Sequence, residues 1–310
     1  MTPVQDEFAL IDAIVEGLAD RAMGEWISLG PGDDAALIRP TPGLQQVASI
    51  DTLLADVHFP AAAPAQLIGY RALMVSFSDL AAMGALPRYC LVSLAIADTP
   101  QGPNQSQTHS RDWVIDLARG MADAARDLGV YICGGNLAKG PLNVAVSVHG
   151  EVDAAGALLR SGAAAGQSLY VTGPLGAAAA CVRTEHMLPV NMAALTPLQQ
   201  AYYRPRARTD LYELQVAATA GIDISDGLAQ DLGHLCQASG CGADLQSAAI
   251  PVAQGALLED ALFGGDDYEL LLASAEMLPA TWCIGRLTAE PGLRLDGESI
   301  APKGFDHFAG

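Results

Sequence analysis

The chain has 310 residues, of which 51% are hydrophobic and 16% are charged, and its formal net charge is −19. These values exclude a disordered chain and describe a folded one long enough for two domains. They also exclude electrostatic binding to a nucleic-acid backbone, which needs clustered Lys and Arg, because the chain has only 16 such residues. An acidic excess usually serves solubility; the alternative is that some carboxylates bind divalent cations.

The six cysteines are scattered without a CxxC pair, and the first residues carry acids where a secretory signal needs positive charge. We therefore expect reduced, buried thiols and a cytoplasmic location. The apolar stretch over 169–182 is short and interrupted by Gly and Pro, so we expect no membrane span.

Residues 1–150 alternate short apolar runs with amphipathic stretches, which predicts a mixed α/β domain. In 141–152, Val144, Val146 and Val148 share one face at a period of two, as in a strand. In chain order we expect a helix over 1–21, a strand over 45–50 ending at Asp51, helix–strand–helix over 65–85, a strand over 88–97, a helix over 111–129, a strand over 130–136 ending in a glycine turn, and a strand over 141–152.

The second half predicts a further α/β domain, over 151–310, after a glycine-rich linker at 153–167. No short-period repeat is visible, although SFSDLAAMG and DISDGLAQD both suggest a strand that runs into a Ser-Asp helix start. The expected elements are a strand and turn over 168–176, a helix over 197–220 broken at Pro205, a strand running into a helix over 221–240, and strands over 242–246 and 281–288.

Several acids stand at expected turns and strand ends. Taken singly, each fits an ordinary helix cap or turn residue. Together they predict a ligand site, because strand ends are where sites form in open α/β sheets. Side chains alternate in an extended chain, so Asp33 and Asp34 should face opposite ways, and Asp223 and Ser225 the same way. The acids concerned are Asp34, Asp51, Asp79, Asp223, Asp226, Asp266 and Asp267.

Common catalytic templates are absent from the sequence. It has no GxxxxGK[ST], HExxH or GxSxG motif and no metal-type Cys/His cluster. GPGDDA at 30–35 approaches a dinucleotide fingerprint, but acids in that turn would repel a pyrophosphate. Among the histidines, only His58 stands beside an acid of the expected site, Asp51.

Seven motifs in one order resemble those of the thiamine-monophosphate kinases, a family of the aminoimidazole ribonucleotide synthetase superfamily. The wording of RALMVSFSDLAAMGALP and GGDDYELL is the most specific part, and the likeness extends over nearly the whole chain. The motifs are GDDAAL (32–37), DTLLADVHF (51–59), RALMVSFSDLAAMGALP (71–87), GGN (134–136), LLRSGA (158–163), DISDGLAQDLGH (223–234) and GGDDYELL (264–271).

The resemblance implies an N-terminal ferredoxin-like domain of the aminoimidazole ribonucleotide synthetase type over 1–150, which binds ATP and Mg²⁺ and pairs with its twin in a homodimer. A C-terminal α/β domain over 151–310 would close the nucleotide and substrate cleft. The implied reaction is thiamine monophosphate plus ATP giving thiamine diphosphate plus ADP, the final step of thiamine diphosphate biosynthesis, with several Mg²⁺ ions.

Matching this chain to the family's motifs assigns roles by position, with no catalytic general base among them. This assignment makes Asp34 a metal ligand and Asp33 a neighbour that stabilises the turn. The matched positions are Asp34, Ser49, Asp51, Asp79, Asn136, Asp223 and Asp226 for Mg²⁺; Gly135, Asn136, Arg160 and Ser225 for the nucleotide; and His58, Asp266 and Phe305 for the thiamine substrate.

Four positions depart from the family's pattern. Ile50 replaces a threonine and offers no side-chain oxygen, and Asn136 replaces an aspartate, which would weaken one Mg²⁺ site. Asp266 stands for a glutamate, and Phe305 lacks the hydroxyl of a tyrosine. The alternatives to the kinase are therefore another ATP-dependent enzyme of the superfamily, or a binding protein for nucleotide or thiamine phosphate without turnover.

The implied chemistry agrees with the composition. ATP and a phosphate acceptor are both anionic, so cations must intervene, and a chain with two lysines has to use metal ions, arginine and backbone N–H groups. The acceptor oxygen is already ionised at neutral pH, so no base is needed. Catalysis would rest on positioning and charge neutralisation.

Overall fold

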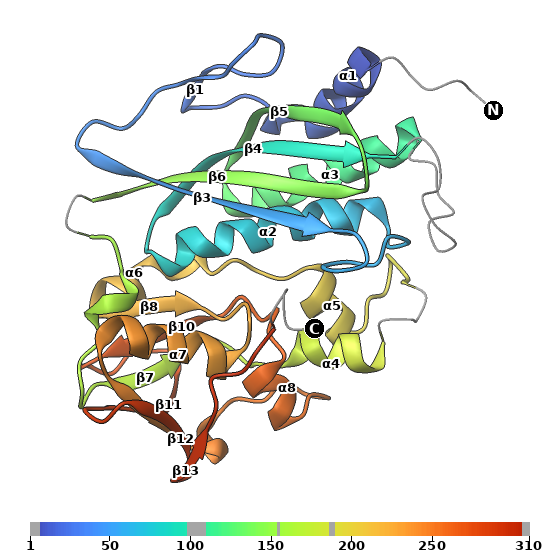
Figure 1. Ribbon diagram of the computed structural model, residues 1–310. Helices are drawn as coiled ribbons and strands as arrows, with labels where there is room; N and C mark the ends of the chain where they lie inside the picture. Colours follow the sequence, from blue (N-terminus) through green and yellow to red (C-terminus); the bar gives the residue numbers. More distant parts are fainter. Residues whose placement is uncertain (1–6, 98–109, 154–155, 186–189, 306–310) are drawn as a thin grey trace. The chain divides into compact units, whose positions relative to one another are not determined.

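The computed structural model describes residues 7–97, 110–153, 156–185 and 190–305. The chain divides into two compact units, an N-terminal unit of Met1–Leu80 and Pro87–Val152 and a C-terminal unit of Ala81–Leu86 and Asp153–Gly310. Both combine helices with β-sheet (Figure 1), as the mixed α/β prediction requires. Within the described ranges, no helix is long and apolar enough to cross a membrane.

The N-terminal unit contains, in its described part, a four-stranded sheet with the strand order β3-β6-β4-β5 (Figure 1). Val144, Val146 and Val148 of β6 are fully buried while the residues between them are half-exposed, which confirms the predicted alternation. The elements are α1 Glu7–Leu18, η1 Ala19–Arg21, β1 Ile27–Leu29, β2 Leu37–Ile38, β3 Leu44–Leu54, α2 Ala65–Ala82, β4 Leu86–Ile96, α3 Arg111–Leu128, β5 Tyr131–Lys139 and β6 Asn143–Asp153.

Helices α2 and α3 pack against each other at glycines. A Cβ on Gly69 would lie 2.1 Å from the carbonyl oxygen of Leu117, so only glycine allows this approach. The predicted helix over 111–129 is confirmed. It begins after Ser110, whose hydroxyl accepts the N–H of Trp113, and ends at Gly129 with φ of 70°.

The prediction of helix–strand–helix over 65–85 is wrong. α2 is one continuous helix, so Asp79 lies in its last turn rather than at a helix start, and the suggested likeness between SFSDLAAMG and DISDGLAQD fails. Almost every residue of α2 is buried. Such a helix lacks the polar face whose 3.6-residue period identifies a helix in sequence.

Two strands run further than predicted. β3 continues through Asp51 to Leu54, and β5 continues through the Gly-Gly-Asn run to Lys139 rather than ending in a turn. Gly135 is accommodated within β5 because β4 and β5 approach closely there: a Cβ on Gly135 would lie 1.9 Å from the carbonyl oxygen of Val92. The glycines therefore mark strand packing instead of a chain reversal.

The C-terminal unit contains, among its described residues, a seven-stranded sheet ordered β13-β12-β9-β11-β7-β10-β8. β12 pairs with β9 in parallel, and the other pairs are antiparallel. The predicted strands, the helix after β8 and the helix break at Pro205 are confirmed. The elements are η2 Arg160–Gly162, β7 Ser168–Val171, α4 Ala177–Thr184, α5 Pro197–Tyr203, η3 Thr209–Leu211, α6 Tyr212–Ala217, β8 Ala220–Asp223, α7 Leu228–Ser239, β9 Gly242–Leu245, η4 Ser247–Ala249, α8 Leu258–Phe263, β10 Leu270–Ser274, β11 Trp282–Thr288, β12 Gly292–Leu295 and β13 Glu298–Ile300.

All six cysteines are free thiols, as predicted, but Cys283 is exposed whereas we expected every thiol to be buried. Burial raises the pKa of the Cys133 thiol to about 11 and that of Cys236 to about 12, so both are held in the unreactive protonated form at neutral pH. Part of the predicted linker, residues 154–155, and residues 1–6 of the predicted first helix lie outside the described residues.

Candidate functional site

The turn before β2 presents Asp33 and Asp34 at the surface. Gly32 there adopts φ of 119°, a conformation that favours glycine. One carboxylate oxygen of Asp33 accepts the backbone N–H of Asp34 at 2.8 Å, so Asp33 stabilises the turn. The described residues offer the Asp34 carboxylate no arginine or lysine as an ion-pair partner. Asp34 is thus an exposed carboxylate on a fixed turn.

Strand β3 places Ser49 and Asp51 on one face and Ile50 on the other, because side chains alternate along a strand. The hydroxyl of Ser49 donates to a carboxylate oxygen of Asp79 at 2.5 Å. Thus the structure brings two of the predicted metal-binding positions, Ser49 on β3 and Asp79 on α2, into direct contact. The side chain of Ile50 is 65% exposed on the opposite face.

His58 follows β3 in a tight turn closed by Leu54. The backbone N–H of Leu54 donates to Nδ1 of His58 at 3.0 Å, and the N–H of His58 donates to the carbonyl oxygen of Leu54 at 2.9 Å. Because Nδ1 accepts a hydrogen bond, the hydrogen of the neutral ring is on Nε2. The carbonyl oxygen of His58 also accepts the Nε–H of the buried Arg71 at 3.2 Å, which holds the turn in place.

Asn136 lies on β5, where it pairs with Ser93 of the parallel strand β4, and its side chain is exposed. Gly135 immediately before it is fixed by the close approach of β4 described above. An exposed amide at this point supplies a neutral oxygen ligand where an aspartate would supply a charged one.

In the C-terminal unit, two acidic segments meet because β8 and β10 pair antiparallel. The register places Asp223, the last residue of β8, opposite Leu270, the first of β10. The segment that follows β8 and the segment that precedes β10 therefore lie side by side, and the N–H of Asp266 donates to the carbonyl oxygen of Ser225 at 2.8 Å. Antiparallel pairing brings these acids together, rather than the strand ends of an open α/β sheet on which the predicted ligand site was argued.

Asp231, in the first turn of α7, organises the turn after β8. One of its carboxylate oxygens accepts the backbone N–H groups of Ser225, Asp226 and Gly227, each at 3.1 Å. The side chain is 2% exposed. Burial, together with the charges of Asp223 and Asp226, raises the pKa of Asp231 to about 8 despite these hydrogen bonds. Asp231 thereby fixes the backbone from which Ser225 and Asp226 project.

The last described residues contact the same turn. The N–H of Phe305 donates to the carbonyl oxygen of Asp226 at 2.9 Å, and Gln230 donates to both the Asp226 carboxylate at 2.9 Å and the Phe305 carbonyl at 3.0 Å. A Cβ on Gly304 would lie 2.2 Å from the Asp226 carbonyl oxygen, so this approach requires glycine. The backbone of Phe305 is therefore held beside Asp226, and the residue is 44% exposed.

The C-terminal unit thus gathers four of the predicted site residues. Ser225, Asp226, Asp266 and Phe305 are joined by the backbone hydrogen bonds just described. Arg160 lies in η2, exposed, with its carbonyl oxygen accepting the hydroxyl of Ser239 at 2.7 Å. No hydrogen bond links its guanidinium to that group among the described residues.

The chemistry of the predicted metal ligands suits Mg²⁺, which prefers hard oxygen donors from carboxylates, hydroxyls and amides. Asp34, Asp79 and Asp226 form no ion pair with any described arginine or lysine, so their charge is not neutralised by the protein. No three His, Cys, Asp or Glu side chains within the described residues are already gathered around a common point for a metal. Mg²⁺ sites often hold one or two carboxylates and several waters, which this donor set allows.

Three contributing residues were missed from the sequence. Asp231 was not selected although it lies five residues after Asp226, and its role depends on the tight turn between them. Glu269 and Arg208 are 61 residues apart in sequence and meet only in the fold. The acid at the end of GGDDYE, and the arginine-rich run after Pro205, were the signals that could have suggested the pair.

Comparison with known proteins gives consistent results. The family model "AIR synthase related protein, N-terminal domain" matches residues 32–152. The curated thiamine-monophosphate kinase of Escherichia coli O157:H7 is 35% identical, and the match covers 98% of each chain.

Two solved structures are also similar. A thiamine-monophosphate kinase from Stenotrophomonas maltophilia K279a is 34% identical with a TM-score of 0.82, covering 95% of this chain and 98% of that one. AaThiL complexed with AMPPCP and TMP is 28% identical with a TM-score of 0.78, covering 99% and 100%. With sequence relatives at this identity over nearly its whole length, the chain belongs to the thiamine-monophosphate kinase family.

Proposed function

We propose that this protein transfers the γ-phosphoryl group of ATP to thiamine monophosphate, producing thiamine diphosphate and ADP, the final step of thiamine diphosphate biosynthesis. The observation that carries the proposal is the full-length match to curated thiamine-monophosphate kinases, together with the likeness to a structure that holds AMPPCP and TMP. The turn and strand positions that the family's motifs assign to ligands are retained, apart from the changes at Ile50, Asn136, Asp266 and Phe305.

Magnesium would be held by oxygen donors from Asp34, Ser49, Asp51, Asp79, Asn136, Asp223 and Asp226. When bound, Mg²⁺ neutralises the phosphate charges and lets the two anionic substrates approach. The Ser49–Asp79 hydrogen bond fixes the orientation of the Asp79 carboxylate in advance. Asp231 fixes the Ser225–Gly227 backbone in the same manner through three N–H groups. The protein's own contribution is therefore a rigid set of oxygen atoms.

Nucleotide contacts are assigned to Gly135, Asn136, Arg160 and Ser225. His58, Asp266 and Phe305 are assigned to thiamine monophosphate. An Nε2–H donor on His58 suits a phosphate oxygen, and the aromatic face of Phe305 suits the cationic thiazolium of thiamine. The acceptor phosphate is already ionised, so no residue has to remove a proton before transfer.

Of the four departures, Ile50 is compatible with activity. Its side chain lies on the face of β3 opposite to Ser49 and Asp51, so replacing a threonine there leaves the predicted ligand face unchanged. Asn136 retains an oxygen ligand without its charge, which predicts a higher Mg²⁺ requirement than an aspartate would give. The Asn136→Asp variant should lower that requirement.

A homodimer formed through the N-terminal unit, which also carries most of the proposed Mg²⁺ ligands, completes the proposal. One face of its sheet carries apolar side chains that the described residues leave exposed. Ile50 is 65% exposed, Leu54 41% and Leu91 38%. Beside them Tyr89 stacks on His149 with ring centroids 4.6 Å apart. A second copy of this sheet would cover these side chains, and a cytoplasmic enzyme of metabolism suits the free thiols.

The test is formation of thiamine diphosphate by the purified protein from thiamine monophosphate, ATP and Mg²⁺. Product that disappears with a chelator and returns with added Mg²⁺ would support the proposal. Thiamine in place of its phosphate should give no product if the phosphate oxygen is the acceptor. Tight binding of both substrates without ADP release would contradict the kinase and favour a binding protein.

A further inference from the structure

The turn that carries Asp266 adopts an unusual backbone conformation. Gly265, Asp266 and Tyr268 have φ of 71°, 63° and 54°. Glycine takes this conformation freely and aspartate tolerates it, but a tyrosine there is strained. Strained segments of this kind persist only where surrounding contacts hold them, and they often belong to ligand sites. The question is which residues hold the turn formed by residues 265–268.

The first half of this turn is held from the segment after β8. The N–H of Asp266 donates to the Ser225 carbonyl and that of Tyr268 to the Ile224 carbonyl, both at 2.8 Å. The hydroxyl of Tyr268 donates to the carboxylate of Asp266 at 2.8 Å, so the tyrosine orients the side chain proposed to contact thiamine monophosphate. These contacts fix the start of the turn but not its exit into β10.

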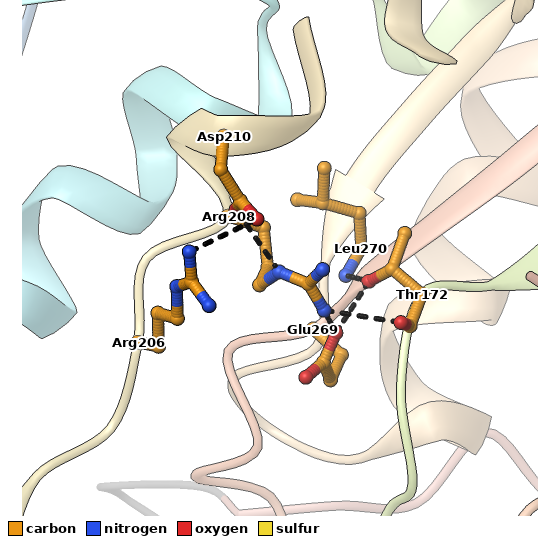
Figure 2. Close-up of polar contacts among 6 residues, drawn as sticks. All are labelled: Thr172, Arg206, Arg208, Asp210, Glu269 and Leu270. Atoms are coloured by element: carbon orange, nitrogen blue, oxygen red, sulfur yellow. Dashed lines mark hydrogen bonds and ion pairs between the residues drawn. The ribbon is translucent and has the colours of Figure 1, made fainter. Parts of the chain in front are cut away.

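The exit is held through the side chain of Glu269 (Figure 2). Its carboxylate accepts hydrogen bonds from the Thr172 hydroxyl and from an NH1 hydrogen of Arg208, both at 2.5 Å. The Thr172 hydroxyl in turn accepts the N–H of Leu270 at 2.8 Å. The carbonyl oxygen of Glu269 accepts the N–H of Ile224 at 2.8 Å, so this one residue connects the exit of the turn to two neighbouring segments.

Glu269 has little freedom to lie elsewhere. A Cβ added to Gly173 would be 2.3 Å from a carboxylate oxygen of Glu269, so the acid sits directly against the backbone of that glycine. Its side chain is 17% exposed and that of Arg208 is 15% exposed. A carboxylate buried to this degree needs a cation, and removing the cation alone leaves an uncompensated charge.

Arg208 supplies this cation and also donates hydrogen bonds to three acceptors. Its NH1 donates both to Glu269 and, at 3.0 Å, to the carbonyl oxygen of Thr172, while its Nε donates to Asp210 at 3.2 Å. Three acceptors in different directions suit the planar guanidinium fork, and a lysine ammonium could not reach all of them. Arg206 beside it contacts only the outer side of this group: it is 68% exposed and pairs with Asp210 at 3.2 Å (Figure 2).

We propose that Arg208 is a positioning residue for thiamine monophosphate: with Thr172 it fixes Glu269, and Glu269 holds the left-handed turn that presents Asp266. The inference rests on the proposed role of Asp266 as a substrate contact. Without Arg208, the buried carboxylate is unpaired and moves toward solvent, and the turn relaxes. Thiamine monophosphate then binds to a less ordered site. Ser225, the assigned ATP contact that touches this turn, stays held by Asp231, and the other assigned ATP contacts lie outside the turn.

The test compares Arg208→Met with Arg206→Met, a matched control in which the exposed neighbour is removed. We expect Arg208→Met to raise the KM for thiamine monophosphate about tenfold, with kcat and the KM for ATP within threefold of the parent. Arg206→Met should leave all three within twofold. Arg208→Lys, which keeps the charge and loses the fork, should fall between the parent and Arg208→Met.

A second substitution keeps the test decisive if Arg208→Met folds poorly. Adding Glu269→Gln removes the unpaired charge, and the double variant should recover stability and part of the affinity. The proposal is overturned if the KM for thiamine monophosphate is unchanged in folded Arg208→Met, or if both KM values and kcat worsen together, which a merely structural role would produce.

Calorimetric titration with thiamine monophosphate separates this inference from the kinase proposal, because it needs no turnover. One outcome is that the parent protein binds thiamine monophosphate without turnover while Arg208→Met binds it about ten times more weakly. That result would contradict the kinase and support the role of Arg208. Equal affinities in the two proteins would overturn the role of Arg208 even if the kinase is active.

Discussion

Each unit of the molecule contains a glutamate paired with an arginine, fully buried in the N-terminal unit and partly buried in the C-terminal one, and the two pairs differ in which donors the carboxylate accepts. In the N-terminal unit Glu151 of β6 pairs with Arg88 of β4 at 2.9 Å. It also accepts the N–H and hydroxyl of Thr41 and the side-chain amide of Gln46. In the C-terminal unit the carboxylate of Glu269 pairs with Arg208 and, among the described residues, accepts one further side-chain hydrogen bond, from the Thr172 hydroxyl.

The two pKa shifts have opposite signs for this reason. Burial alone would raise both pKa values. For Glu151 the hydrogen bonds from Thr41, Arg88 and Gln46 outweigh burial and lower the pKa to about 2. For Glu269 burial outweighs Arg208 and Thr172, and the pKa is raised. An arginine partner is thus not enough to lower the pKa of a carboxylate: Glu151 has more hydrogen-bond donors, whereas burial and the nearby charge of Asp210 both raise the pKa of Glu269.

The comparison also separates two uses of such a pair. Glu151 joins β6 and β4 to the loop at Thr41, and none of its donors is a predicted site residue, so it serves the fold. Glu269 is three residues from Asp266 and holds a strained turn. The carboxylate that accepts fewer hydrogen bonds is therefore the one next to a proposed ligand contact. A carboxylate that has to hold a strained turn in place has fewer positions in which all of its oxygen lone pairs can accept hydrogen bonds.

The largest effect is expected when the well-satisfied pair is broken. Glu151→Ala removes four hydrogen bonds and leaves Arg88 without its buried counter-ion, so the free energy of unfolding should fall by about 3–5 kcal/mol. Urea unfolding measures this. Glu16→Ala, which removes an ion pair of a glutamate 66% exposed, is the control and should cost less than about 1 kcal/mol. Equal losses would refute the contrast between buried and exposed pairs.

Stability measured at acidic pH should reveal that the pKa shifts of Glu151 and Glu269 have opposite signs. The pKa of Glu151 is lowered on folding, so its contribution is present above pH about 4.5 and is lost as the pH falls toward about 2, on the order of 3 kcal/mol. Glu151→Gln should therefore flatten the acid limb of stability against pH. The pKa of Glu269 is raised, so its contribution is present at low pH and lost as the pH rises. Glu269→Gln should not flatten the acid limb.

A smaller effect is expected from the hydroxyl that joins Glu269 to Leu270. Thr172→Val leaves the N–H of Leu270 without an acceptor and Glu269 with Arg208 alone, which should cost about 1–3 kcal/mol. The KM for thiamine monophosphate should rise about threefold, less than for Arg208→Met. Thr172→Ser retains the hydroxyl and should have the stability and KM of the parent. If Thr172→Val also matched the parent, Thr172 would have no role in holding Glu269.

The sequence predicted those elements whose pattern shows one buried and one exposed face. α3 and β6 are of this kind, since α3 carries a polar stripe and β6 alternates its valines. α2 was misread because nearly all of its residues are buried, and burial removes the periodicity that distinguishes helix from strand.

The candidate site divides in the same way. Asp34, Asp223 and Asp226 could be selected from turn signals, and the family resemblance assigned their roles. Asp231 acts through a tight turn, and Arg208 and Glu269 meet across 61 residues. Local signals mark Glu269 and the arginines singly, but only the fold brings the two together. The two acidic segments lie side by side because β8 pairs with β10 antiparallel, a pairing that the sequence did not predict.

The Mg²⁺ dependence of thiamine diphosphate formation in Asp34→Asn and Asp33→Asn tests the central proposal most directly. The two carboxylates are adjacent and both are exposed, but only Asp34 is a proposed ligand, while Asp33 accepts the N–H of Asp34, a role that asparagine retains. The Mg²⁺ concentration for half-maximal rate should rise at least about tenfold in Asp34→Asn and stay within about twofold in Asp33→Asn. An unchanged Mg²⁺ requirement in Asp34→Asn, or an equal shift in both variants, would contradict the account.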